Sequence, residues 1–178
     1  MALALAFAPA LSRPDLLAEP VAAALGALRL PEPVDVAPID ADLADTAEFC
    51  ATYGVRLDES ANCVVVAGRR GQTVTYAACV VLATTRADVN GLVRRRLDAR
   101  KASFAAREDA VEATGMEFGG ITPIGLPASW PVLVDTAVLA APRMIVGSGL
   151  RRSKISLSGK TLGLLPGAEV LDGLGVPA

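Results

Sequence analysis

The chain has 178 residues, of which 52% are hydrophobic and 4% aromatic, and its formal net charge is −2. A chain of this length can form one domain that buries about 70% of its unfolded surface, mostly in an aliphatic core. It contains no histidine, which excludes Ser–His and Cys–His nucleophile systems and histidine-ligated metal sites. The sequence indicates no cofactor, so catalysis would depend on carboxylates, lysine, hydroxyls, backbone amides, water or the substrate's own groups.

The first eleven residues are apolar but lack the positive region of an export signal, and the run breaks at residues 12–15. We interpret residues 1–18 as an N-terminal extension and residues 19–178 as the functional domain. No apolar run reaches the ~18 residues that a membrane span requires, so no membrane partner is expected. The three cysteines form no Cys-x-x-Cys pair and are typical of small buried side chains in a reducing cytoplasm.

Apolar patterns and glycine or proline boundaries predict the elements in chain order. We expect helices over 19–28, 45–53, 87–97 and 106–114, with Gly54 and Gly115 ending the second and fourth, and a last helix or turn over 158–164. We expect strands over 34–37, 62–67, 75–82, 132–134, 143–146 and 154–157, the second and third joined as a hairpin by a loop over 68–72. These elements predict a single mixed α/β domain with a central mixed β-sheet flanked by helices.

The segment 116–127, Met-Glu-Phe-Gly-Gly-Ile-Thr-Pro-Ile-Gly-Leu-Pro, is the most informative part of the chain. Its glycines adopt backbone angles that other residues avoid, and its prolines fix φ and lack an N–H donor, so it is neither regular helix nor central strand. A loop of fixed shape with accessible backbone amides can hold an anion or the oxyanion of acyl transfer. The alternative interpretation is a tight connection between two elements.

The order Gly119-Gly120-Ile121-Thr122-Pro123-Ile124-Gly125 resembles the glycine–proline loop of the bacterial prolyl-tRNA editing family. That family includes YbaK-type deacylases of Cys-tRNA(Pro) and Ala-tRNA(Pro), and the editing domain inserted in bacterial prolyl-tRNA synthetases. Motifs in the family's order surround the loop: 45–48 and 54–55, 61–66, 132–135, 145–149 and 155–157. The similarity covers roughly residues 34 to 171, and it implies the α/β fold of the YbaK/synthetase-associated editing domain.

The resemblance also implies which residues act in ester hydrolysis. The glycine loop would surround the scissile ester with its backbone amides, which gives the expected catalytic set Gly119, Gly120, Ile121, Thr122, Pro123 and Asp135. Asp135 matches a family aspartate, although a structural role in holding the loop is an equal alternative, and Thr122 either supplies a hydroxyl or caps a turn. The expected substrate-binding set is Asn62, Gly125, Gly147, Gly149, Lys101 and Arg151.

One residue departs from the family pattern. The family usually carries a lysine, associated with the substrate's acceptor end and with activity, where this chain has Asn62. Asparagine forms hydrogen bonds but brings no positive charge. Three explanations stay open: another cation (Lys101, Arg69 or Arg151) fills the role, the reaction differs, or the site binds without cutting.

Charge is distributed unevenly along the chain. Residues 15–59 contain ten acidic and two basic side chains, whereas residues 60–107 contain nine basic and two acidic ones, including the run Arg94–Arg96. Such asymmetry can present a basic face to phosphates. We therefore expect a freestanding trans-editing deacylase that binds mischarged tRNA, with tRNA-Pro carrying alanine or cysteine as substrate and prolyl-tRNA synthetase as the suggested protein partner. The alternatives are an aminoacyl-tRNA or acyl-adenosine binding module without turnover, and a small-ligand α/β protein; the oligomeric state is left open.

Overall fold

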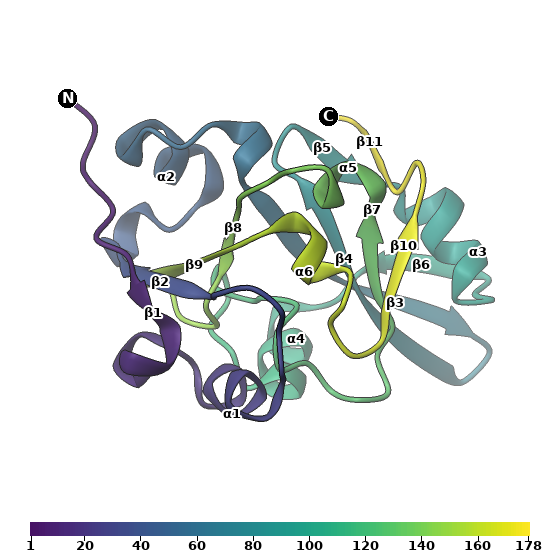
Figure 1. Ribbon diagram of the computed structural model, residues 1–178. Helices are drawn as coiled ribbons and strands as arrows, with labels where there is room; N and C mark the ends of the chain where they lie inside the picture. The colour runs from purple at the N-terminus through teal and green to yellow at the C-terminus, as the bar shows by residue number, and fades with distance from the viewer.

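Two β-sheets form the framework of the protein in the computed structural model, which describes residues 1–178. The larger sheet has the strand order β10-β7-β4-β3-β6 and the smaller one the order β1-β2-β9-β8. Figure 1 shows the smaller sheet on the left and the larger sheet on the right. The two sheets meet where Ser60, just before β3, bridges to Ile145 of β8. Helices pack around these sheets, so the predicted mixed α/β class is confirmed.

The hairpin of β3 (Ala61–Arg70) and β4 (Thr73–Leu82) is the centre of the larger sheet. The predicted loop over 68–72 was wrong, because both strands continue to a two-residue turn in which Gly71 has φ 60°. Gly68 is not a turn residue; a Cβ there would lie 3.0 Å from both Ala99 and Leu97 side-chain carbons. The outer parts of these strands are polar and exposed, which hides them from a hydrophobic pattern.

Three further strands complete the larger sheet. Strand β7 (Val132–Asp135) runs parallel to β4 and to β10 (Ala168–Leu171), and β6 (Lys101–Phe104) is antiparallel to β3. The parallel and antiparallel pairs make the sheet mixed. The sequence patterns missed β6 and β10, since an exposed edge strand does not need the apolar alternation of a buried one.

The smaller sheet is antiparallel throughout. It consists of β1 (Ala8–Pro9), β2 (Asp35–Pro38), β9 (Ser153–Leu157) and β8 (Met144–Gly147). Lys154 lies opposite Gly147 in the β8–β9 register. The N-terminal residues thus contribute β1, and Leu16, Leu17 and Ala18 are buried in the main core.

The predicted helix near residues 19–28 and the two helices that end at glycines are confirmed. Helix α1 spans Glu19–Ala27, α2 spans Thr46–Tyr53 and α4 spans Arg107–Thr114; Gly54 and Gly115 follow α2 and α4 with φ of 65° and 67°. A left-handed residue at this point satisfies the last carbonyls of a helix, and glycine adopts it without steric cost. The remaining short helices are α5 (Thr136–Leu139) and α6 (Gly159–Leu162).

The predicted continuous helix over 87–97 was wrong. Residues Thr85–Ala87 form β5, which pairs with β11 (Gly175–Pro177), and a π-helical turn over Val89–Val93 then leads into the short α3 (Arg94–Arg96). Asp88 accepts hydrogen bonds from the backbone N–H groups of Gly91 (3.0 Å) and Leu92 (2.8 Å), which starts the turn. The last helix or turn predicted over 158–164 is confirmed as the single turn of α6. No helix of the chain has both the length and the apolar character needed to span a bilayer.

Candidate active site

A cavity of about 470 Å³ lies at the junction of the two sheets. Its walls come from the start of α2, the first half of β3, the end of β6, α4, the glycine loop (residues 116–127), β8 and β9. Ser60 and Ile145, which bridge the sheets, both line it. Twelve of the nineteen lining residues are hydrophobic, so the few polar groups in the cavity lie in surroundings of low polarity, where electrostatic interactions are stronger than in water.

The glycine loop is fixed against the end of β8. The N–H of Gly149 donates to the carbonyl oxygen of Gly120 (2.7 Å), and the N–H of Glu117 donates to that of Gly149 (2.8 Å). A Cβ at Gly147 would collide with the Gly120 carbonyl oxygen and lie 2.8 Å from that of Ile121. The absence of a side chain at Gly147 therefore lets the backbone of β8 lie directly against the backbone of the glycine loop, which brings the predicted site glycines of the two segments together.

Two loop amides have no partner in the protein. Gly119 and Ile121 line the cavity, and their backbone N–H groups donate to no protein acceptor, whereas the N–H of Gly120 donates to Glu117 (2.9 Å). Gly119 has φ 87°, a conformation in which glycine is strongly preferred. Unpaired backbone donors in a partly enclosed site are suited to a carbonyl oxygen or an oxyanion.

Asn62 lies in the cavity wall on β3, as its predicted substrate-binding role requires. Its side-chain oxygen accepts a hydrogen bond from the hydroxyl of Thr46 (2.6 Å), at the first residue of α2. The amide nitrogen of Asn62 donates to no protein group. The contact with Thr46 therefore fixes the amide and leaves its donor side for a ligand.

Lys154 also lines the cavity, and sequence reasoning missed it. Its side chain is 8% exposed; the Nζ atom donates to the carbonyl oxygen of Ala44 (3.0 Å) and lies 5.1 Å from the centre of the Phe49 ring. Burial lowers the pKa of Lys154 from 10.5 to about 8, an effect that the nearby Cys50 and Asp45 oppose and Arg151 reinforces. The available signal was a lysine inside a strand of otherwise small and apolar residues.

The three cations proposed from the sequence to replace the family lysine do not line the cavity. Lys101 and Arg69 are exposed register partners on β6 and β3, outside the cavity wall. Arg151 is at the cavity rim: its guanidinium lies 3.4 Å from Asp45 and 3.4 Å from the carbonyl oxygen of Phe118, and it donates to Ala41 (3.1 Å). Arg151 therefore joins the residues before α2 to the glycine loop.

Eight of the twelve predicted site residues do not line the cavity; besides Gly120, Gly149, Lys101 and Arg151 they are Asp135, Thr122, Pro123 and Gly125. Asp135 is buried at the end of β7, where its carboxylate accepts hydrogen bonds from the N–H groups of Ala137 (2.8 Å) and Gly175, so it holds α5 and β11 rather than the glycine loop. The hydroxyl of Thr122 is buried without a partner. Pro123 is buried, and Gly125 packs closely against the carbonyl group of Pro20 in α1.

Two exposed aromatic side chains border the cavity. Phe104 at the end of β6 is 62% exposed and Phe118 in the glycine loop is 46% exposed. The guanidinium of Arg107 lies over the Phe118 ring, 4.9 Å from its centre. Sequence reasoning found no aromatic platform for bases, since these residues are fourteen positions apart and only the fold brings them to one cavity.

The thiol of Cys63 lines the cavity as well. Its surroundings exclude water and raise its pKa far above the ordinary thiol value, with a smaller contribution from Cys79. A thiol held in the protonated form is a poor nucleophile. No group of three His, Cys, Asp or Glu side chains that could hold a metal ion is present.

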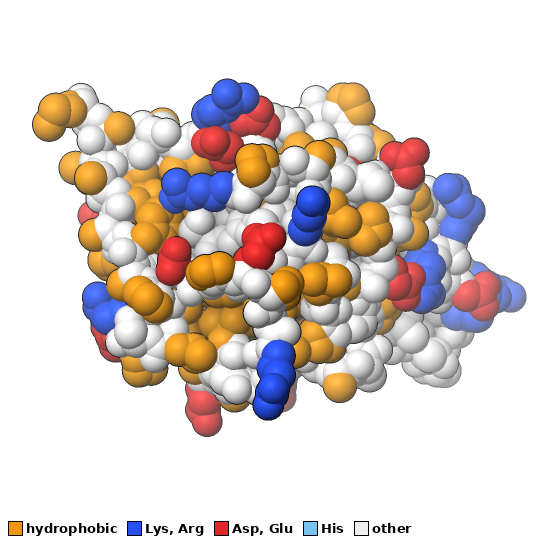
Figure 2. Space-filling view, in the orientation of Figure 1, with side chains coloured by type: hydrophobic (Ala, Val, Ile, Leu, Met, Phe, Trp, Pro, Cys, Tyr) orange, Lys and Arg blue, Asp and Glu red, His pale blue; other side chains and the backbone are white.

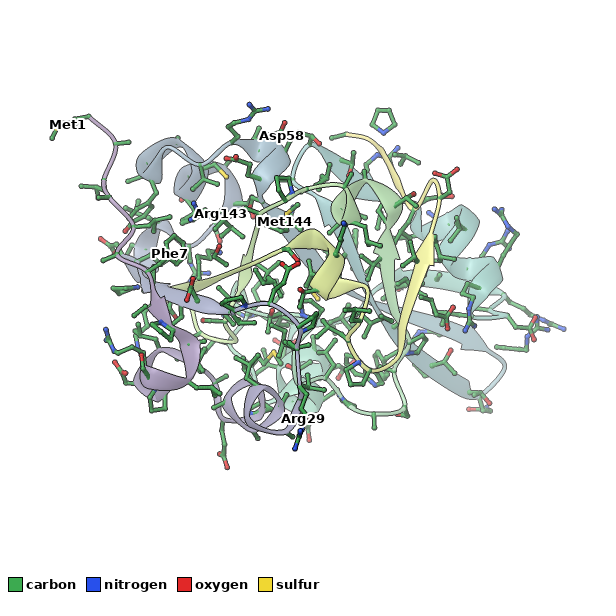
Figure 3. All side chains as sticks on the ribbon, in the orientation of Figure 1. Met1, Phe7, Arg29, Asp58, Arg143 and Met144 are labelled. Carbon is green, nitrogen blue, oxygen red and sulfur yellow. The ribbon has the colours of Figure 1, made fainter.

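The basic clusters are partly neutralised within the protein. Arg96 pairs with Glu169 (Nε to Oε2, 2.6 Å), and Asp98 pairs with Arg70 (2.7 Å) rather than with the Arg94–Arg96 run. Figure 2 shows basic and acidic side chains mixed at the edge that carries α3 and the hairpin end. Arg143 lies over the Phe7 ring, 4.6 Å from its centre; both residues are labelled in Figure 3. Arg107 and Arg151, beside Phe118, are the basic side chains at the cavity rim.

The family model of the aminoacyl-tRNA editing domain matches residues 40–163, which include the cavity walls. This match spans well over half of the chain, so the protein belongs to the aminoacyl-tRNA editing domain family. The class of function is therefore aminoacyl-tRNA editing.

Individual relatives are distant. The chain is 26% identical over 128 residues to YwhH of Bacillus subtilis (strain 168), described as uncharacterized, covering 72% of this chain and 78% of that protein. A solved structure provisionally named a trans-editing enzyme for prolyl-tRNA synthetase superposes with a TM-score of 0.67 at 24% identity, covering 78% and 85% of the two chains. The hypothetical protein APE2540 superposes with a TM-score of 0.69 at 22% identity, covering 79% and 90%. At these identities the two structures establish the fold.

Proposed function

We propose that the protein is a trans-editing deacylase that hydrolyses the ester bond of a mischarged tRNA. The observation that carries this proposal is the apolar cavity lined by Asn62 and by Gly119 and Ile121, whose backbone N–H groups have no protein acceptor. Ester hydrolysis needs a positioned water, stabilisation of the tetrahedral oxyanion and a pocket for the amino acid. The N–H groups of the loop are suited to stabilising the oxyanion, and the cavity is suited to holding the amino acid.

In the proposed reaction a water oxygen bonds to the ester carbonyl carbon, and negative charge moves onto the carbonyl oxygen. The amides of Gly119 and Ile121 donate to that oxygen, while Gly120 and Pro123 keep the loop in shape. The bond to the ribose oxygen then breaks, and a proton from the attacking water ends on the leaving oxygen. The neighbouring ribose hydroxyl of the substrate orients the water, so histidine is not required.

The acceptor end of tRNA would lie across the rim. A base stacked on Phe118 or Phe104 gains about 1–3 kcal/mol, and Arg107 and Arg151 lie where the adjoining phosphates would pass. Phosphate contacts of this kind make affinity fall as salt rises. This arrangement supports tRNA, rather than a free amino acid ester, as the substrate.

The proposed substrate is tRNA-Pro carrying alanine or cysteine, with prolyl-tRNA synthetase as the associated protein. The family resemblance of the glycine loop and the name of one structural neighbour support this choice. The apolar side chains that make up most of the cavity wall suit a small side chain without charge.

The test is a deacylation time course on tRNA-Pro charged with alanine, cysteine or proline. We expect hydrolysis of a wrong ester, little hydrolysis of the proline ester, and at least a tenfold loss in Gly147→Ala, whose added Cβ would displace the loop. Gly26→Ala is the matched control, because a Cβ there meets no atom within 4 Å. Binding of all three charged tRNAs without any turnover would overturn the proposal.

That last result would favour a second function, an aminoacyl-tRNA or acyl-adenosine binding module. Asn62 motivates it, because the side chain brings no charge to the position where the family carries lysine. Turnover that appears only in Asn62→Lys would establish the binding module, whereas robust wild-type turnover would exclude it.

A further inference from the structure

Lys154 is a buried cation with a largely unfilled set of hydrogen-bond donors. An ammonium group has three N–H donors, and the structure pairs Lys154 with one acceptor, the carbonyl oxygen of Ala44. No carboxylate forms an ion pair with it. The Phe49 ring, 5.1 Å from Nζ, is its other neighbour. A buried charge is costly when it is incompletely paired, so an ammonium that lines a cavity with unfilled N–H donors is suited to an oxygen atom of a ligand.

The side chains of Lys154 and Asn62 reach the same short segment, residues 44–46. Lys154 donates to Ala44, and Asn62 accepts from Thr46, so the two side chains contact backbone and side-chain atoms only two residues apart in the chain. All four residues line the same cavity. A cation from β9 therefore reaches the part of the wall where β3 presents a neutral amide.

Lys154 also shares a sheet face with the glycine loop. Directly opposed residues of an antiparallel pair point to the same side of the sheet, and Lys154 is opposite Gly147. The Cβ position of Gly147 points at the carbonyl oxygens of Gly120 and Ile121. The ammonium and the loop therefore approach the cavity from one face of the β8–β9 pair.

We propose that Lys154 is a catalytic residue whose ammonium donates to the ester carbonyl oxygen as negative charge develops on it. This inference rests on the deacylase function proposed above and adds a third donor to the amides of Gly119 and Ile121. The proton stays on Lys154 throughout, the attacking water supplies the proton that the leaving ribose oxygen gains, and no further reactant is needed. The charge of the site thus comes from β9 rather than from position 62.

The test compares single-turnover and steady-state deacylation by the wild type, Lys154→Met and the double variant Lys154→Met/Asn62→Lys, on the ester that the wild type cleaves. We expect Lys154→Met to lower kcat about 100-fold or more, the usual effect of removing one oxyanion donor, with KM changed less than about threefold because the interaction forms in the transition state. The double variant should recover at least about tenfold. The exposed Lys160 on α6 provides the control Lys160→Met, which should keep full activity.

The outcomes separate the two proposals. If the wild type cleaves none of the charged tRNAs, so that no such ester exists, the deacylase function itself is refuted. An active wild type with an equally active Lys154→Met would refute the role of Lys154 alone. Loss of activity in Lys154→Met without recovery in the double variant, together with a lowered melting temperature, would assign Lys154 a structural role and overturn the inference.

Discussion

Methionine at position 154 would preserve most of the length of the lysine side chain while removing its charge from the cavity wall. The pKa of Lys154 falls from 10.5 to about 8 on folding, with burial as the main cause. At 1.36 kcal/mol for each pKa unit, keeping the ammonium charged in the fold costs about 3 kcal/mol at neutral pH. Loss of the hydrogen bond to Ala44 offsets about 1 kcal/mol, so Lys154→Met should raise the free energy of unfolding by about 2 kcal/mol.

The pH dependence gives a second, more direct measure. The pKa of Lys154 is lower in the folded than in the unfolded protein, so the unfolded chain binds more protons between about pH 8 and 10.5. The free energy of unfolding of the wild type therefore rises with pH in that window, relative to that of the variant. The advantage of Lys154→Met should therefore be full below about pH 8 and disappear as pH approaches 10.5. Other titrating groups are common to both proteins and cancel in the difference.

Urea unfolding of the wild type and Lys154→Met at intervals from pH 7 to 10 measures this difference, with Lys160→Met as the exposed control. The control should differ from the wild type by the same small amount at every pH. A Lys154→Met protein that is less stable than the wild type by a constant amount would refute the reasoning, since it would mean that the ammonium is well solvated or well paired. Higher stability combined with lost activity would show that Lys154 is retained for function.

Three other substitutions test the rim and the predicted aspartate. Phe118→Ala should raise the KM for charged tRNA by about 5- to 150-fold, as loss of about 1–3 kcal/mol of stacking implies. Val74→Ala, at an exposed position away from the cavity, should leave this KM unchanged. Arg107→Gln should reduce the slope of log affinity against log salt by about 1, and Arg29→Gln serves as the exposed control. Asp135→Ala should lower the free energy of unfolding by about 1–3 kcal/mol because it leaves two backbone N–H groups unpaired. The kcat of the protein that remains folded should be unchanged. A normal melting temperature together with a loss of kcat would contradict this prediction.

The sequence was sufficient to predict the ends of helices where a single residue determines the local backbone conformation. Gly54 and Gly115 end helices because the left-handed conformation there is easy for glycine, and both boundaries follow from the pattern alone. The family order of motifs also assigned Gly147 and the glycine loop to one predicted site, but it did not predict that they touch. The physical cause of their contact, a backbone approach that admits no Cβ, is visible only in the fold.

Elements whose character depends on neighbours were not predictable. Strand β6 has an exposed, polar sequence, and only pairing with β3 makes it a strand. Lys154 appeared to be a boundary residue of a predicted strand, because sequence alone does not tell which face of β9 meets the core. The same limit applies to Phe104 and Phe118, whose proximity to one cavity is a tertiary property.

The polar groups of the cavity are best explained together. The fold leaves the amides of Gly119 and Ile121 unpaired and an ammonium with one partner among mostly apolar walls. Among these donors the Lys154 ammonium is buried, and a buried donor without an acceptor costs about 1–3 kcal/mol, and more if it is charged, while the nearby carboxylate of Asp45 is engaged at the rim with Arg151. A fold selected for stability alone would pair or replace this ammonium. Because all of them are donors, the missing partner is an acceptor, and a carbonyl oxygen that becomes an oxyanion satisfies them most fully when its charge is greatest.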